Sequence, residues 1–182
     1  ALNTKRGGFG GIVTRERVKP IIAAVDGPAL AGGTEIVLAC DLVVASTQAR
    51  FGIPEVKRSL VAAAGGLFRL PRKIPFNIAM EAALTGDPIS AERAYHFGLV
   101  NRLVEPGTAF DAAIELAEAI SVNAPLAVRE SRRLVLESIT VTDDGEGVRQ
   151  SGAALMGLAS TEDFAEGPMA FIEKRDPVWK GR

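Results

Sequence analysis

The 182-residue chain contains one cysteine, one histidine, one tryptophan and one tyrosine. With a single thiol, at Cys40, no internal disulfide can form, and the apolar helical run around it predicts a buried small side chain. A lone cysteine fits a reducing compartment, so we expect a cytoplasmic protein. His96, the only histidine, stands near Gly98 at the end of a predicted helix, and we expect it to pack or to face solvent rather than to take part in catalysis.

Neither sign of charge is in excess, because 21 Lys and Arg residues accompany 22 Asp and Glu residues, for a net charge of −1. A strongly basic surface is the footprint of nucleic-acid binding, and the composition argues against that class of partner. No apolar run approaches the roughly 20 residues that span a bilayer. We therefore expect no nucleic acid and no membrane among the partners, and no metal site.

The chain begins without a methionine and without the charged and apolar regions of a signal peptide. Its first stretch, residues 3–11, is polar and glycine-rich, with no strand ahead of it. Within it, Gly7–Gly11 lacks both the lysine of a phosphate-binding loop and a preceding strand, which argues against a nucleotide loop there. Such a beginning is typical of the middle of a longer protein, so we expect an N-terminal part to be absent from this sequence.

The chain then alternates short apolar runs with helical segments. Ile21–Val25 and Asp41–Ala45 are predicted as buried strands, and Gly32–Cys40 between them as a helix. A strand, a helix and a strand in this order predict parallel pairing with a right-handed crossover. Other expected features are a turn at 26–28, helices at Ile12–Val18, Ile74–Leu84 and from Ser90 to Gly98, a strand at Leu99–Val104, and an end at Pro71 for the element that begins at Ala62.

From Pro106 onward only helices are expected. Apolar residues recur at a helical period in Thr108–Val122. Pro125 suits the first turn of the next helix, residues 142–144 cap a third, and Ser160 or Thr161 caps the last. We therefore predict two parts, an α/β core over residues 1–106 and an α-helical oligomerisation region over residues 107–182.

The most informative stretch is Ala24–Glu35, where an apolar run ends in a turn and two glycines open a helix. The first N–H groups of a helix have no intrahelical acceptors and carry partial positive charge, so they can bind a developing oxyanion. Gly32 lets a substrate approach that backbone closely, and Glu35 follows on the same helix face. An oxyanion donor beside an acid/base group indicates enolate chemistry. On spacing alone, close helix–sheet packing explains the glycines equally well.

A second carboxylate, Glu55, follows Glu35 after a helix, a strand and a turn. That interval can return the chain to the same end of the sheet, where ligands bind in open α/β sheets. Two carboxylates in one pocket can divide the tasks of accepting and donating a proton. On residues alone, each glutamate could instead be a favourable partner of a helix dipole. Lys57 and Arg58, two and three residues after Glu55, are candidate ion-pair partners for it.

Taken together, these segments resemble the crotonase superfamily, also called the enoyl-CoA hydratase-isomerase superfamily. The motifs that carry the resemblance are IIAAVDGPALAGGTEIVLACD at 21–41, FGIPE at 51–55, AGG at 64–66, LTG at 84–86, SAERA at 90–94, GLV at 98–100 and EGPMAFIEKR at 166–175. The resemblance implies a β-β-α spiral core, incomplete at its N-terminus, and a C-terminal α-helical trimerisation region. A homotrimer or hexamer is therefore expected.

The resemblance also implies roles for single residues. Gly32 matches the glycine whose N–H is one of two oxyanion donors for the thioester carbonyl, and Gly33 beside it is expected to bind substrate. The other donor of the family would lie before Ala1. Glu35 and Glu55 match the two glutamates that hold a water in the family's hydratases, whereas many relatives keep only one or neither.

Coenzyme A is the expected ligand at the far end of the chain. Phe171 and Lys174 match residues that reach coenzyme A, and lysine suits a phosphate as a point charge. An acyl-CoA thioester is thus the expected partner, and no separate cofactor is expected because coenzyme A is part of the substrate. The Gly-Thr-Ile-Pro-like stretch that many of the family's hydratases carry after the second glutamate is replaced here by Arg58–Ala62, so a different acyl pocket is expected.

The expected activity is that of an enoyl-CoA hydratase, a hydro-lyase that adds water syn to a trans-2-enoyl-CoA and gives 3-hydroxyacyl-CoA in fatty-acid β-oxidation. One alternative is an enoyl-CoA isomerase of the same superfamily, for which a single glutamate suffices. Another is a non-catalytic acyl-CoA-binding protein on this fold.

Overall fold

The computed structural model describes residues 2–182, which divide into two compact units. One unit ends at Leu116 and the other spans Ala117–Arg182, so the division falls inside helix α5 (Ala109–Ser121). The boundary predicted between residues 106 and 107 lies earlier, in the loop that leads into α5. The strands of the described residues all belong to the first unit, and the second unit is helical.

Two three-stranded sheets form the centre of the first unit. One sheet is parallel, with the strand order β3 (Ile22–Val25), β5 (Leu42–Ser46) and β8 (Arg102–Val104). The other has the order β4 (Pro28–Leu30), β6 (Arg50–Gly52) and β7 (Ile89–Ser90), in which β4 and β6 are parallel and β7 is antiparallel.

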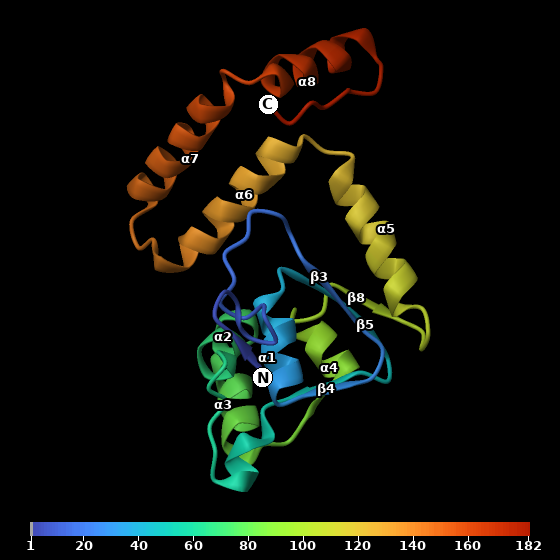
Figure 1. Ribbon diagram of the computed structural model, residues 1–182, viewed down its shortest axis with the longest axis vertical. Helices are drawn as coiled ribbons and strands as arrows, with labels where there is room; N and C mark the ends of the chain where they lie inside the picture. The colour runs from blue at the N-terminus through green and yellow to red at the C-terminus, as the bar shows by residue number, and fades with distance from the viewer. Residues whose placement is uncertain (1) are drawn as a thin grey trace. The chain divides into compact units, whose positions relative to one another are not determined.

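From β3 to β6, consecutive strands alternate between these two sheets, which gives the core a spiral path. β3 leads into β4 and β5 leads into β6, and each pair puts one strand in each sheet. Helix α1 (Gly32–Ala39) makes the crossover from β4 to β5, and Figure 1 shows β3, β5 and β8 side by side. The predicted parallel β-α-β unit is confirmed, while the turn predicted at 26–28 is shorter than expected because Pro28 already begins β4.

The main core lies on one face of β5, because successive side chains of a strand point to opposite faces. Val43 and Ala45 belong to the large apolar cluster that also contains Phe51, whereas Val44 packs on the other side with Ala109 and Ala113. All three β5 side chains are fully buried. The core thus fixes the strands that precede both predicted catalytic glutamates.

The C-terminal end of α1 is held by two cations. Arg17 donates to the Ala39 carbonyl at 2.5 Å and Lys73 donates to the Cys40 carbonyl at 3.0 Å. Positive charge at a helix C-terminus is favourable because the last carbonyls carry partial negative charge. Burial lowers the pKa of Lys73, and the nearby Asp41 carboxylate acts against that shift. Cys40 itself is buried, as predicted, and burial raises the pKa of its thiol.

Helix α2 (Gly66–Lys73) corrects one prediction, because Pro71 lies inside the helix rather than ending it. Proline at this position removes the single hydrogen bond that its N–H would donate to the Leu67 carbonyl. The helix continues for two residues because Leu70 is anchored in the core and its carbonyl accepts from the Ile74 N–H at 3.1 Å.

Helices α3 (Phe76–Thr85) and α4 (Ala91–His96) follow the predicted pattern with small shifts. α3 begins after Pro75 rather than at Ile74, since a residue that precedes proline avoids helical angles. Gly86 ends it in the left-handed region, and the Ser90 side chain caps α4, both as predicted. His96 is exposed and touches the Phe97 ring edge-on. The strand predicted at Leu99–Val104 is shorter, because β8 starts only at Arg102.

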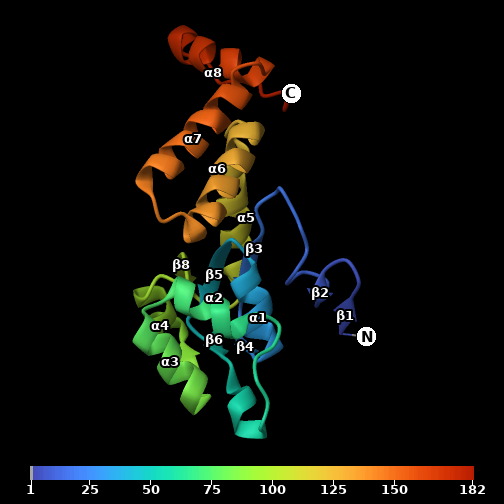
Figure 2. The same ribbon diagram turned by 90° about the vertical axis from the view of Figure 1, so that its left-hand side faces the viewer.

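The helix predicted at Ile12–Val18 does not form. Residues 11–14 are turns that follow the two-residue strands β1 (Asn3–Thr4) and β2 (Gly8–Phe9), and Gly8, Gly10 and Gly11 all have positive φ. These glycines adopt backbone angles outside the right-handed helical region, and the apolar run that follows them is too short to nucleate a helix. A Cβ atom on Gly10 would lie 2.9 Å from Cδ1 of Ile36, so this segment lies beside α1. Figure 2 shows the path of the backbone through β1 and β2.

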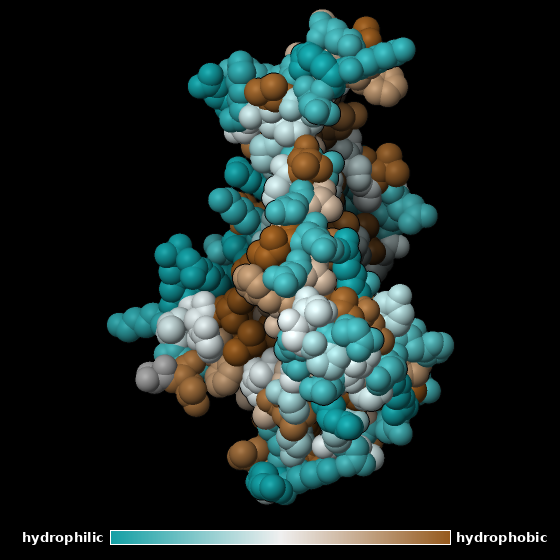
Figure 3. Space-filling model, turned by 90° about the vertical axis from the view of Figure 1, so that its right-hand side faces the viewer, coloured by the Kyte–Doolittle hydropathy of each residue, from teal (hydrophilic) through white to brown (hydrophobic). Residues whose placement is uncertain are grey.

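The second unit consists of helices joined by short turns. They are α6 (Pro125–Glu137), the 3-10 turn η2 (Ser138–Thr140), α7 (Asp144–Leu158) and α8 (Glu162–Glu173). Pro125 opens α6, the Asp143 side chain caps α7 and the Thr161 side chain caps α8, which confirms the predicted helix starts. Many large apolar side chains of these helices stay exposed, and Figure 3 shows hydrophobic residues among hydrophilic ones on the face it presents.

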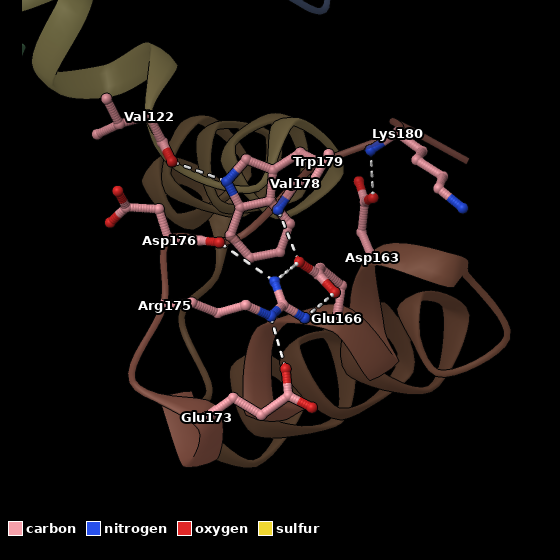
Figure 4. A network of polar contacts seen from close by, with 9 residues as sticks. All are labelled: Val122, Asp163, Glu166, Glu173, Arg175, Asp176, Val178, Trp179 and Lys180. Carbon is pink, nitrogen blue, oxygen red and sulfur yellow. Dashed lines mark hydrogen bonds and ion pairs between the residues drawn. The ribbon is translucent and has the colours of Figure 1, made fainter. Parts of the chain in front are cut away.

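The C-terminal tail after α8 folds back on this helix through a polar network that the sequence pattern did not predict (Figure 4). Glu166 accepts two hydrogen bonds from the Arg175 guanidinium, at 2.6 and 2.9 Å, and one from the Val178 N–H at 2.7 Å. Asp163, which is buried, accepts from the N–H groups of Lys180 and Gly181. The tail is therefore held by backbone as well as side-chain donors.

Because of this network, we expect the free energy of unfolding to depend on pH in the acidic range. Hydrogen bonds from Arg175 and from the Val178 N–H lower the pKa of Glu166 from 4.5 to about 2. A carboxyl whose pKa is depressed by folding stabilises the folded state above its unfolded pKa, and this contribution is lost as the pH falls from 4.5 through about 2.

We expect Glu166→Gln to unfold at lower urea concentration than the unaltered protein at neutral pH, and the gap to narrow at about pH 3, where unfolded carboxyls are mostly protonated. The control is Glu118→Gln, at an exposed helical position. A gap that stays constant across this pH range would contradict the role given to the ionised Glu166.

Candidate active site

Helix α1 begins on a strained residue. Ala31, the residue before the helix, has φ 52° and ψ −126°, and its N–H donates to the Gly52 carbonyl at 2.8 Å. An L-residue in this region costs about 1–3 kcal/mol, and such strain persists where surrounding contacts impose it, typically at functional sites. Gly32 is the first helical residue, so its N–H has no partner within the helix. Both features agree with the predicted oxyanion donor.

The two glycines of the motif have different surroundings. A Cβ atom on Gly32 would lie 2.3 Å from Cζ of Phe9, so the Phe9 ring occupies the space directly beside that backbone. A Cβ atom on Gly33 would meet only the Ala29 Cβ, at 3.8 Å. The close contact with the Phe9 ring therefore requires glycine at position 32, whereas position 33 has room for a side chain. The sequence alone does not distinguish the two glycines.

Thr34 joins the start of α1 to strand β6. Its hydroxyl oxygen accepts from the Gly52 N–H at 2.8 Å, and its one hydrogen can go to the Gly52 carbonyl at 2.9 Å or to the Ala29 carbonyl at 2.5 Å. The side chain is 1% exposed. A buried N–H without an acceptor is costly, so the hydroxyl fixes α1 against β6. No local pattern in the sequence predicts this role of Thr34.

Glu35 is 4% exposed, and its Oε1 accepts from the Gly66 N–H at 2.9 Å. Gly66 is the first residue of α2, so the carboxylate receives a free N–H at the positive end of a helix dipole. A Cβ atom on Gly66 would lie 3.0 Å from both Ile53 and Ala62 and 3.2 Å from the Glu35 carboxylate. Glycine is thus needed there for Glu35 to approach the helix.

A cation stands in the neighbourhood of Glu35. The Arg69 guanidinium donates to the Ala64 carbonyl at 3.1 Å and to the Val13 carbonyl at 2.5 Å. Burial lowers the pKa of Arg69, and the Glu35 carboxylate is among the charges that oppose this shift. Arg69 therefore links residues 13 and 64 beside Glu35, and it balances part of the negative charge of the site.

Glu55 lies in the 3-10 helix η1 (Pro54–Arg58), three residues after the Gly52 that Thr34 holds. Its Oε2 is buried and has no hydrogen-bond partner among the described residues. The expected pairing of Glu55 with the cations that follow it does not form, because Lys57 pairs with Asp87 at 2.5 Å and Arg58 donates to the Lys57 carbonyl. A buried carboxylate oxygen without a donor is costly unless a ligand or water supplies one.

Glu55 and Gly66 line the same cavity, of about 410 Å³, in the first unit. Glu35 itself is not among the lining residues, but its carboxylate accepts from the N–H of Gly66, which is one of them. That both glutamates act on a single bound molecule stays a prediction. No group of three or more metal-binding side chains occurs among residues 2–182.

Phe171 and Lys174 belong to the second unit. Phe171 is 86% exposed, and Lys174 ends α8 with a left-handed backbone at φ 55°. Their predicted contact with coenzyme A stays a prediction.

No helix within the described residues has both the length and the apolar character of a membrane span.

Comparison with known proteins shows which family the chain belongs to. A family model described as enoyl-CoA hydratase/isomerase matches residues 14–182. The chain is 52% identical to a solved enoyl-CoA hydratase from Mycobacterium tuberculosis H37Rv, which covers 100% of this chain and 71% of its own, with a TM-score of 0.94. The chain belongs to the enoyl-CoA hydratase/isomerase family. The expected crotonase-like fold is confirmed by this agreement.

Other relatives within the family carry a different name. A carnitinyl-CoA dehydratase of Salmonella agona is 40% identical over 181 residues, which are 97% of this chain and 69% of that protein. A solved carnitinyl-CoA hydratase of Mycobacterium avium is 47% identical, with a TM-score of 0.70, and is matched over 96% of this chain and 68% of its own. The relatives of this chain thus carry names with different acyl-CoA substrates.

The Thr34 hydroxyl gives a direct test of how the site is held. We expect Thr34→Val to lower the free energy of unfolding by about 1–3 kcal/mol, because the buried Gly52 N–H loses its acceptor while the shape is kept. Thr34→Ser, which keeps the hydroxyl, should lose clearly less. Urea unfolding of the three proteins measures both values, and equal stability of the valine and serine variants would rule out the link.

Proposed function

We propose that the protein is an enoyl-CoA hydratase, which adds water to a trans-2-enoyl-CoA and gives 3-hydroxyacyl-CoA. The observation that carries the proposal is the buried, unpartnered Oε2 of Glu55 in the wall of a cavity whose Gly66 binds the second carboxylate, Glu35. In this proposal both carboxylates reach the bound substrate, where they can hold and activate a water, and the start of α1 supplies a free N–H for the thioester oxygen. Family membership supports the same reaction class.

In the proposed reaction, the Gly32 N–H binds the thioester carbonyl and polarises the conjugated double bond. Water held between the glutamates attacks C3, giving up a proton, while C2 receives a proton and the enolate collapses to the 3-hydroxyacyl thioester. We assign activation of the water to Glu35 and delivery of the proton to Glu55. Glu35 is suited to a fixed role because Gly66 and the core hold it in place.

The remaining assignments follow from the resemblance. Gly33 binds substrate beside Gly32, and Phe171 and Lys174 reach coenzyme A. The exposed apolar side chains of the second unit are consistent with a surface that other subunits cover in a homotrimer or hexamer. A place in fatty-acid β-oxidation and a cytoplasmic location complete the proposal.

An enoyl-CoA isomerase is the second candidate, and one observation favours it. The Glu35 carboxylate already binds Gly66, whereas Glu55 has a free oxygen, and a single free carboxylate suffices to move a proton along an acyl chain. Product analysis separates the candidates, since a hydratase gives 3-hydroxyacyl-CoA and an isomerase gives a shifted double bond. Tight acyl-CoA binding without either product would identify the third candidate, a binding protein.

Glu35→Gln and Glu55→Gln test the roles of the carboxylates. General acid–base groups contribute about 10²–10⁴-fold to a rate, so each variant should lose hydration of crotonyl-CoA by that order while keeping its fold. The measurement is the loss of absorbance of the conjugated thioester, with Glu118→Gln as a control at an exposed position. Unchanged turnover in either variant would remove that glutamate from the mechanism.

A further inference from the structure

The turn that leads into α2 carries the donor that holds Glu35. Oε1 of Glu35 accepts from the Gly66 N–H at 2.9 Å, and Gly66 directly follows a turn at residues 63–65. Within this turn Ala63 is exposed and Ala64 is half-buried. Segments with few buried contacts open locally at low cost in free energy. A further contact is therefore needed to fix the direction of the Gly66 N–H relative to the carboxylate.

Arg69, one turn further along α2, supplies that contact. Its Nη1 donates to the carbonyl of Ala64 at 3.1 Å, and its backbone N–H donates to the carbonyl of Gly65 at 3.0 Å. A Cβ atom on Gly65 would lie 2.1 Å from Nη1, so the guanidinium lies directly against the backbone of the turn. Both ends of Arg69 are thus attached to the residues that precede Gly66.

The other side of the guanidinium is attached to the N-terminal segment. Nη2 donates to the carbonyl of Val13 at 2.5 Å, and the Val13 side chain is buried. The Val13 N–H donates to the Phe9 carbonyl at 3.3 Å, and the Phe9 ring lies against Gly32 at the start of α1. Because α1 also carries Glu35, Arg69 connects the helix of the carboxylate to the turn that holds its donor.

The orientation of the guanidinium is fixed by an aromatic ring. Cζ of Arg69 lies 4.8 Å from the centroid of the Phe68 ring, which is a cation–π contact. Arg72 contacts the same ring at 5.4 Å but is exposed, whereas Arg69 is half-buried. The Glu35 carboxylate is close enough for its charge to act on that of Arg69. A planar guanidinium held by its two nitrogens and by its face is well suited to fix backbone groups.

We propose that Arg69 is a positioning residue for Glu35, which it aligns by joining the Ala64 carbonyl to the Val13 carbonyl. The inference rests on the proposed function, because Glu35 is the group that activates the water there. Arg69 is not among the residues that line the cavity, so it acts through Glu35. Proton transfer depends on geometry, and a misplacement of about 1 Å caused by a change far from the reacting atoms can cost about 10²-fold in rate.

Steady-state hydration of crotonyl-CoA by Arg69→Met tests the proposal. We expect kcat to fall by at least about tenfold and KM to change by less than about threefold, because the alignment of Glu35 affects the transition state more than the binding of the thioester. Arg72→Met is the matched control, since it removes an arginine from the same helix and the same ring. Equal losses of kcat in the two variants, or a rise in KM at constant kcat, would overturn the proposal.

Lysine at position 69 separates the two hydrogen bonds from the charge. Arg69→Lys keeps the positive charge but offers one nitrogen in place of a planar fork, so it cannot reproduce the geometry that joins the two carbonyls. We expect its kcat to lie closer to that of Arg69→Met than to that of the unaltered protein. It also serves as the milder variant in case methionine disturbs the fold, which urea unfolding reports. Full activity of Arg69→Lys would assign the effect to charge and would overturn the proposed bridge.

A positioning residue acts through the group that it positions. In a Glu35→Gln background, Arg69→Met should therefore lower kcat by less than about threefold more, because the carboxylate that Arg69 aligns is already lost. A general weakening of the fold would lower kcat by the same factor in both backgrounds. Such multiplying losses would contradict the proposal.

Amide hydrogen exchange of Gly66 reports on the alignment without turnover. The Gly66 N–H should exchange at least about tenfold faster in Arg69→Met than in the unaltered protein, while Arg72→Met leaves its exchange unchanged. Unchanged exchange in Arg69→Met would overturn the positioning role, whether or not the protein hydrates crotonyl-CoA. Faster exchange in a protein that does not hydrate crotonyl-CoA would keep the alignment of Glu35 by Arg69 and overturn the hydratase proposal.

Discussion

The site depends on one buried contact, between the Thr34 hydroxyl and the backbone of Gly52. Thr34 directly precedes Glu35, and Gly52 stands three residues before Glu55. The hydroxyl oxygen accepts from the Gly52 N–H at 2.8 Å. This bond joins the start of α1, which carries Glu35, to the end of β6, which is followed by Glu55. Glu35 is carried by α1 and Glu55 by η1, so this contact, together with the bond from Ala31 to the Gly52 carbonyl, fixes one carboxylate relative to the other.

The two carboxylates differ in their settings, and the difference is useful for proton transfer. Glu35 is held by the first N–H of α2 and lies near Arg69, so its position is fixed by donors. Glu55 stands in an apolar wall with one oxygen that lacks a donor. Environments that differ in this way let chemically identical groups take different roles in one reaction. The strained Ala31 and the close contact between Gly32 and the Phe9 ring both lie at the start of α1.

Much of this arrangement was predictable from sequence, and the exceptions have physical causes. The parallel strand pair and the helix starts at Pro125, Asp143 and Thr161 follow from periodicity and caps. The joint action of the two glutamates follows from the family motifs and stays a prediction. The sequence predicts a helix end at Pro71, but the helix continues because the tertiary packing of Leu70 outweighs one lost hydrogen bond. Thr34 and the network of the C-terminal tail were missed because they join residues far apart in the chain through side chains, and no local pattern encodes such contacts.

The central claim is that Glu35 and Glu55 act on one molecule in one cavity. The most direct measurement is kcat for hydration of crotonyl-CoA by the double variant Glu35→Gln/Glu55→Gln, compared with the two single variants. Groups that work as a unit give strongly non-additive losses, so the account predicts a double variant about as slow as the slower single variant. Losses that multiply, as for independent sites, would contradict it.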